Sequence, residues 1–206
     1  MLFFLFSALA APPEGWTYVD TKDGIEVSQK TFADSPLFAF RGEAVVDVHT
    51  SVLLELLLDD PKGAEWVDLM NFSKRLKSLD PNTHILHQSY DLPWPIQDRD
   101  YLLKQEVQYD QANKVATIEF HSFEDPILPE QECCIRAYAT RTYWKFSAQP
   151  DGSTHVIVEV LTDPKGSLPA WLVNLIQQDW PYNSIHNLSE RAKKGDIPKE
   201  ELTKDW

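Results

Sequence analysis

The sequence predicts an α+β protein in which a curved antiparallel sheet wraps around a long C-terminal helix. Two observations lead to this fold class. Runs of alternating apolar and polar residues follow one another along the chain with short turns between them, and one amphipathic helical stretch comes last. A chain of 206 residues with 43% hydrophobic content can close one sizeable core. We therefore expect a single domain over residues 12–206.

The alternation is clearest in the run from Phe38 to Asp47. Its even-numbered residues are apolar or glycine, and Arg41, Glu43 and Asp47 lie between them on the other face. This pattern indicates a half-buried antiparallel strand. Five more period-two runs predict the further strands of a meandering sheet, over Thr83 to Tyr90, Tyr101 to Asp110, Val115 to Ser122, Thr140 to Ala148 and His155 to Thr162.

A short helical pair is expected after the third strand. Its first helix begins after Thr50, a candidate N-cap, and continues through a leucine-rich stretch. Pro61 and Gly63 then break the pattern, and a second short helix runs through Trp66.

The long helix near the C-terminus has the strongest helical periodicity. Ser167 is a candidate N-cap, Pro169 stands where a helix tolerates proline, and apolar residues recur at helical spacing as far as Leu188. Pro181 falls inside this pattern, where it removes one backbone hydrogen bond. The helix is therefore expected to bend there and to follow the curved sheet.

The charge of the chain excludes one class of partner. With 19 Lys plus Arg against 32 Asp plus Glu, the formal net charge is −13. Such a chain repels phosphate backbones and offers no polybasic patch to anionic lipid. Nucleic acid is therefore not expected as a partner.

The N-terminus resembles a secretion signal. Met1 to Ala11 is a short apolar run closed by small residues, although no Lys or Arg precedes it. We expect residues 1–11 to be a signal peptide and the protein to be periplasmic or secreted. A cytoplasmic protein with an apolar N-terminus is the alternative.

Neither the cysteines nor the histidines predict a metal site or a cofactor. Cys133 and Cys134 are adjacent, and neighbouring side chains of a strand point to opposite faces, so the usual unstrained bridge is not expected. The six histidines show no metal-ligand spacing, and His84 and His87 should face opposite sides of one strand. The usual nucleotide-binding and nucleophile motifs are also absent from the sequence.

Several segments carry a family resemblance. The segment Asp91 to Asp100, DLPWPIQDRD, resembles the Trp-Pro and Arg-Asp signature of START (StAR-related lipid transfer) domains. The segment Asp163 to Asn174 resembles the family's entry into its C-terminal helix, and the likeness runs in order from about Trp16 to Leu188. It is closest to single-domain bacterial START proteins that bear a signal peptide. The resemblance implies a helix-grip (START/Bet v 1-like) fold whose cavity, between sheet and helix, takes one lipid or other hydrophobic molecule.

The resemblance also implies a movable loop beside the ligand entry. Leu92, Trp94 and Ile96 project from a segment braced by two prolines, and we interpret this segment as the gate. An amphipathic Trp at that place can touch a membrane during loading, so transient membrane contact is expected. The alternative is that Trp94 simply plugs the end of the core.

Gln105 is a polar residue on the inner face of the strand from Tyr101 to Tyr109. In the steroid-handling branch of the family this region resembles a strand with a buried arginine paired to an acid. Here the matching position is Gln105, and the neighbouring strand offers His87 or Gln88, which argues against a sterol ligand. The amide can bind a neutral head group, or it can be a satisfied core amide or bind water.

Ligand contacts are expected from inward-facing side chains. The resemblance assigns them to Trp66, Tyr90, Trp94, Gln105, Phe120, Trp144, Leu172, Leu175 and Ile176. A solid core would bury the same kinds of residue.

The predicted function is the binding or transfer of a lipid or other hydrophobic molecule without catalysis. Arg99 and Asp100 are interpreted as a structural pin at the start of a strand. Two alternatives stay open. One is a grip-fold cyclase or hydrolase that uses Arg99, His87 or Asp100, and the other is a ligand-free scaffold for a protein partner.

Overall fold

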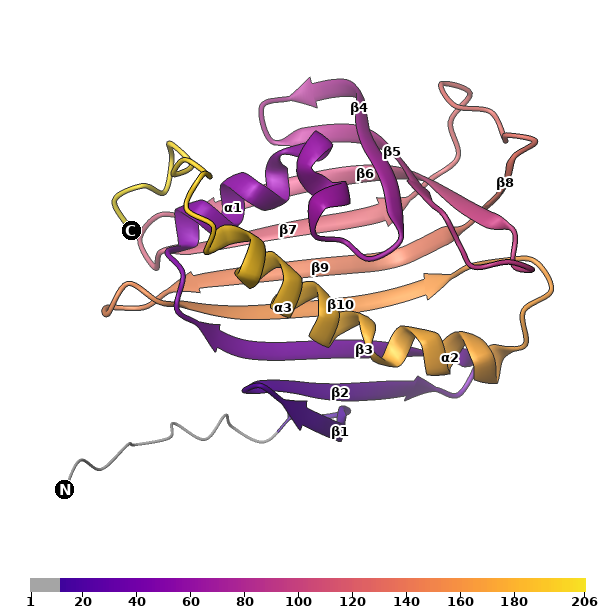
Figure 1. Ribbon diagram of the computed structural model, residues 1–206, viewed down its shortest axis with the longest axis horizontal. Coiled ribbons are helices and arrows are strands. Elements are labelled where there is room, and N and C mark those ends of the chain that lie inside the picture. The colour runs from indigo at the N-terminus through magenta and orange to yellow at the C-terminus, as the bar shows by residue number, and fades with distance from the viewer. Residues whose placement is uncertain (1–11) are drawn as a thin grey trace.

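The computed structural model describes residues 12–206, so the predicted signal peptide, Met1–Ala11, lies outside the described residues. Within the described part, a curved sheet of ten strands wraps around the C-terminal helices, as Figure 1 shows. The predicted fold class is confirmed. The strands are β1 (Thr17–Lys22), β2 (Ile25–Phe32), β3 (Ser35–Val46), β4 (Met70–Asp80), β5 (Thr83–Tyr90), β6 (Asp98–Asp110), β7 (Val115–Ser122), β8 (Cys134–Arg136), β9 (Tyr138–Ala148) and β10 (Thr154–Asp163).

The strands follow the order β1-β2-β3-β10-β9-β7-β6-β5-β4, with each pair antiparallel and β8 added in parallel to β6. β5 and β7 coincide with their predicted ranges. β4 was not predicted. Its pairing with β5 shifts register at three points, and these irregularities remove the strict alternation by which a strand is recognised in sequence.

The expected helical pair after the third strand is present as α1 (Thr50–Leu58) and the 3-10 helix η1 (Asp60–Glu65). The predicted N-cap is wrong by one residue. His49 caps α1, since its Nδ1 accepts a hydrogen bond from the Ser51 backbone N–H at 3.2 Å. The Thr50 hydroxyl instead lies 2.8 Å from the Thr154 hydroxyl and ties α1 to β10.

The C-terminal helix is divided into α2 (Ala170–Gln178) and α3 (Trp180–Ala192). The break lies at Asp179, so the bend precedes Pro181, which occupies the first turn of α3, where its missing N–H costs nothing. Ser167 does not cap the helix, because Pro169 is the N-cap residue of α2 and makes no side-chain capping bond.

α3 lies against the inner face of β3 at one close approach. A Cβ atom at Gly42 would stand 2.9 Å from the Cβ of Pro181 and 3.1 Å from the Cδ1 of Ile185. Glycine at this position therefore allows the helix to contact the sheet, and Ile185 and Leu188 are buried in the shared core. In the part of the chain that the structure describes, no helix is long and apolar enough to cross a membrane.

Candidate ligand-binding site

A cavity of about 70 Å³ lies between the sheet and the helices. Five of the predicted contact residues line it, namely Trp66, Tyr90, Gln105, Phe120 and Trp144. They come from the segment after η1 and from four strands. Thr142 of β9 and Trp180 at the start of α3 also line it and were not predicted. The helical periodicity of the sequence does not distinguish Trp180 from the neighbouring residues, so it did not identify Trp180 as a cavity residue.

Several aromatic rings gather around this cavity. The Trp144 ring stacks on Phe146 at 5.7 Å between centroids, and it meets Trp66 at 6.0 Å and Trp180 at 6.3 Å edge to face. Pockets for drug-sized ligands usually measure about 300–1,000 Å³. A molecule of lipid size therefore enters only if rings or helices move.

Gln105 is fully buried, and no described residue bonds to its amide oxygen or nitrogen. The strand neighbours that the sequence offered do not reach it. Gln88 donates to the Ser73 hydroxyl at 3.2 Å and accepts from the Tyr90 hydroxyl at 3.1 Å, whereas His87 lies on the other face of the sheet. The residue directly opposite on β5 is His84.

Trp66 is the second residue of the cavity with an unused hydrogen-bonding group. Its Nε1–H is buried and meets no acceptor within residues 12–206. Leaving a buried polar group unpaired costs on the order of 1–3 kcal/mol. The cavity therefore holds a donor from Trp66 and both a donor and an acceptor from Gln105.

The charge of the cavity lining is low. Its one carboxyl group belongs to Asp60, whose Oδ2 accepts from the Nε of Arg75 at 2.7 Å. Burial raises the pKa of Asp60 above its usual range, and the Arg75 guanidinium offsets part of that effect. Burial also raises the pKa of Tyr90, so its hydroxyl stays neutral.

A surface groove of about 700 Å³ lies beside the cavity, between α3 and the segment after η1. Trp66 and Val67 line both the groove and the cavity, so they form the wall between them. Arg191 of α3 holds this side together, because its guanidinium lies 2.6 Å from Glu65 and 2.6 Å from Asp196.

The expectation that Leu175 and Ile176 face inward is wrong. Their side chains are 58% and 51% exposed, and Leu172 is half-buried without lining the cavity. α2 instead turns inward the side that carries Val173, Asn174 and Gln177. Asn174 donates to the Pro36 carbonyl at 2.9 Å and accepts from the Phe38 N–H at 3.0 Å, and these bonds fix the rotation of the helix.

The loop from Leu92 to Gln97 presents Trp94 to solvent. Trp94 is 92% exposed, so it neither plugs the core nor lines the cavity. Leu92 and Ile96 are half-buried beneath it. The loop is closed at its base, where the Leu92 N–H donates to the Asp98 carboxylate at 2.8 Å.

Arg99 and Asp100 bond to other parts of the chain. The Nε of Arg99 donates to the Pro164 carbonyl at 2.8 Å and its Nη2 to the Lys165 carbonyl at 3.2 Å. Asp100 is fully buried and accepts from the Nε and Nη2 of Arg136 at 3.0 and 2.8 Å. These bonds fasten the start of β6 to the loop before α2 and to β8.

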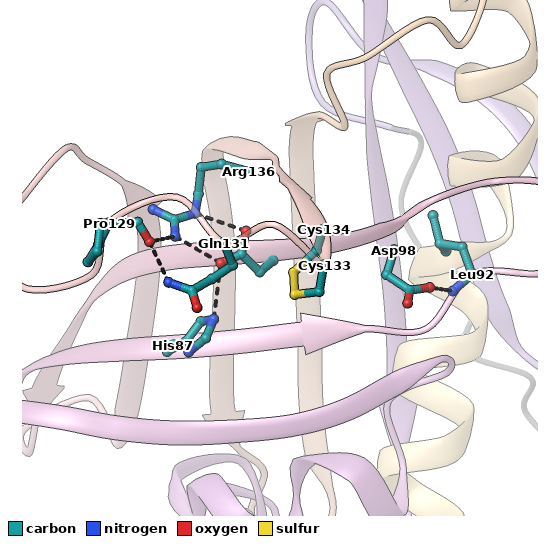
Figure 2. The surroundings of a disulfide bond; sticks show 9 residues. His87, Leu92, Asp98, Pro129, Gln131, Cys133, Cys134 and Arg136 are labelled. Carbon is teal, nitrogen blue, oxygen red and sulfur yellow. Dashed lines mark hydrogen bonds and ion pairs between the residues drawn. A yellow bond between two sulfur atoms is a disulfide. The ribbon is translucent and has the colours of Figure 1, made fainter.

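His87 completes the cluster around Asp100, with its Nε2 3.1 Å from the carboxylate. Figure 2 shows His87 and Arg136 approaching from two different strands. Burial lowers the pKa of His87 below its usual range, and the Asp100 carboxylate offsets part of this effect.

The two cysteines lie together at the start of β8. Cys133 and Cys134 are joined by a disulfide (Figure 2). Cys133 lies in a turn and only Cys134 belongs to β8, so the two side chains do not alternate between the faces of one strand. Among the described residues, no three His, Cys, Asp or Glu side chains gather as a metal site.

Comparison with known proteins agrees with this architecture. A family model described as START domain matches residues 5–178. An uncharacterised protein of Pseudomonas aeruginosa, PA1579, is 31% identical over 186 residues, which cover 88% of each chain. The structure of human StAR-related lipid transfer protein 5 superposes with a TM-score of 0.82 at 17% identity and 89% coverage of both chains. A fragment of the STAR-related lipid transfer protein from Xanthomonas axonopodis superposes with a TM-score of 0.78 at 22% identity, covering 87% of this chain and 99% of that one. The predicted resemblance is confirmed, and the chain belongs to the START domain family.

Proposed function

We propose that this protein binds one lipid or other hydrophobic small molecule between its sheet and its C-terminal helices, and carries it without chemical change. The observation that carries the proposal is the internal cavity bounded by Trp66, Gln105, Trp144 and Trp180. Two structural relatives are named lipid transfer proteins, which supports the same function here. Burial of the ligand's apolar surface would supply about 25 cal/mol per Å².

Ligand entry requires a movable element, and α2 fits this role. Val173 is its one buried residue, and the remaining attachment consists of hydrogen bonds from Asn174 and Gln177. The break at Asp179 separates it from the well-buried α3. Since Trp180 follows that break directly and its ring covers the cavity, a swing of α2 would also enlarge the binding space. The opposite side is held by the ion pairs of Arg191.

The first experiment is native mass spectrometry of protein purified from its own host, followed by organic extraction. The expected result is one small apolar molecule per chain. A mass equal to that of the bare protein, unchanged after incubation with a panel of lipids, would refute the carrier function. That result would favour a ligand-free scaffold, to which the small volume of the cavity also points.

Catalysis by Arg99, His87 or Asp100 is not part of this proposal. In the described structure none of these three side chains lines the cavity, and each is engaged in bonds to other residues. An enzyme that used them would require a second ligand position outside the cavity.

We also propose transient contact with a membrane through the end of the molecule that carries Trp94 and α2. Arg99 holds the loop before α2 beside the base of the Trp94 loop, and Figure 1 shows both at one end of the sheet. Trp171, Leu175 and Ile176 add exposed apolar side chains. With a net charge of −13, the chain should prefer zwitterionic over anionic bilayers.

A vesicle experiment tests this membrane contact. The double change Trp94→Ala and Leu175→Ser should reduce sedimentation with phosphatidylcholine vesicles severalfold, because it removes apolar groups that would enter the interface. Leu79→Ser is the matched control, since Leu79 is 51% exposed at the β4–β5 turn at the far end of the sheet. Equal binding of wild type and the double variant would refute the proposed contact.

Export to the periplasm or the exterior remains part of the proposal. The apolar run Met1–Ala11 supports it. Fractionation of host cells, with N-terminal sequencing of the mature protein, tests this location.

A further inference from the structure

We propose that the cavity selects a ligand with an uncharged polar end group that both accepts and donates hydrogen bonds, such as a hydroxyl or a primary amide. The inference rests on the proposed function and names the class of molecule bound. Its basis is the set of polar residues that line the cavity and the state of their bonding.

Gln105 carries the argument. Its side chain is fully buried on β6, between His84 of β5 and Phe120 of β7, and both ends of the amide lack a partner among the described residues. An amide presents N–H donors at one end and an acceptor at the other. A ligand group that satisfies both ends must therefore contain an acceptor and a donor.

The Trp66 indole adds a second donor from the opposite wall, the segment that follows η1. Apart from the Thr142 hydroxyl, the remaining polar side chains of the lining are already engaged. Gln88 donates to Ser73 and accepts from Tyr90, and Asp60 accepts from Arg75. Among the described lining residues, the fully buried polar groups without a partner are therefore those of Gln105 and Trp66.

Charged end groups do not fit this lining. Lys, Arg and His are absent from it within the described residues, so a carboxylate or phosphate would lose its hydration without meeting a cation. An ammonium group would find aromatic faces, but the one nearby carboxylate is already paired with Arg75. A neutral hydroxyl or amide avoids both costs.

A small cavity sets the size of the test probes. We would titrate protein labelled with ¹⁵N at tryptophan with hexan-1-ol, hexanamide, hexane, hexanoate and hexyltrimethylammonium. The chain has seven tryptophans, and Trp66→Phe identifies the indole resonance of Trp66. Hexan-1-ol and hexanamide should bind about tenfold or more tightly than hexane and should shift the Trp66 indole N–H signal.

Two variants separate hydrogen bonding from general apolar binding. In Gln105→Leu, hexan-1-ol should lose its advantage over hexane, because the side chain keeps its approximate size and loses its polar atoms. Gln108→Leu is the matched control, since Gln108 lies on the same strand and is exposed. It should keep the wild-type preference.

Each other outcome would overturn the inference. Equal affinity for hexane and hexan-1-ol, tightest binding of hexanoate or hexyltrimethylammonium, or an unchanged preference in Gln105→Leu would refute it. If no hexyl probe binds but a lipid copurifies with the protein, the end-group inference fails and the carrier function stands. If neither is observed, both fail.

Discussion

Replacing Asp100 with alanine is expected to lower the free energy of unfolding by about 3–5 kcal/mol. Asp100 is fully buried and accepts two hydrogen bonds from Arg136, whose side chain is 18% exposed. Its removal leaves a guanidinium in a largely desolvated place without a counter-charge. The same change releases His87 and loosens β8 from β6, because the Asp100–Arg136 bonds join these two strands.

Urea unfolding followed by tryptophan fluorescence measures this effect, because a midpoint that moves at constant slope reports stability alone. Glu106→Ala is the control. Glu106 belongs to the same strand and pairs with Lys104 at 2.7 Å, but its side chain is 37% exposed, so less than about 1 kcal/mol should be lost. Similar losses in the two variants would show that Asp100 is not a structural pin.

Gln105→Leu is expected to have the opposite effect on stability. It should raise the free energy of unfolding of the ligand-free protein by about 1–3 kcal/mol. The native amide is buried with both ends unpaired, so its replacement by an apolar side chain of similar size removes a desolvation cost. In a chain of this length, each kcal/mol gained in the free energy of unfolding should raise the melting temperature by about 2–4 °C.

Calorimetry of delipidated protein checks this prediction. Gln108→Leu is the control, because Gln108 is exposed, and its free energy of unfolding should lie within about 0.5 kcal/mol of the wild-type value. A loss of stability in Gln105→Leu would mean that the amide is satisfied in solution, for example by water. A gain in stability together with weaker ligand binding would identify Gln105 as a residue retained for function at the expense of stability.

Much of the sheet could be predicted from the sequence, because its inner and outer faces differ in chemistry. Strands such as β5 and β7 alternate without interruption, and their bounds follow directly. The sequence pattern does not predict β4, because three register irregularities shift its side chains from one face to the other. The break at Asp179 could not be predicted from the sequence either, because the apolar spacing of the helix continues across it.

The candidate site was predictable where it lies on strands and much less so on helices. The position of Gln105 on the inner face follows from period two, and the structure places it there with Phe120 and Trp144. For α2 the same kind of reasoning failed. Apolar side chains at helical spacing identify one face of a helix, but Asn174 and Gln177 decide by hydrogen bonds which face meets the sheet.

The pairing of β3 with β10 has a consequence for how the chain folds. This pairing joins the first three strands to the rest of the sheet, and a contact beside it joins residues 104 positions apart, Thr50 and Thr154. A ribosome has to release most of the chain before β3 meets its partner. Until then β1, β2 and β3 form a three-stranded meander in which the pairing edge of β3 stays open. Closure of so long a loop slows folding, and this protein should therefore fold after synthesis and not during it.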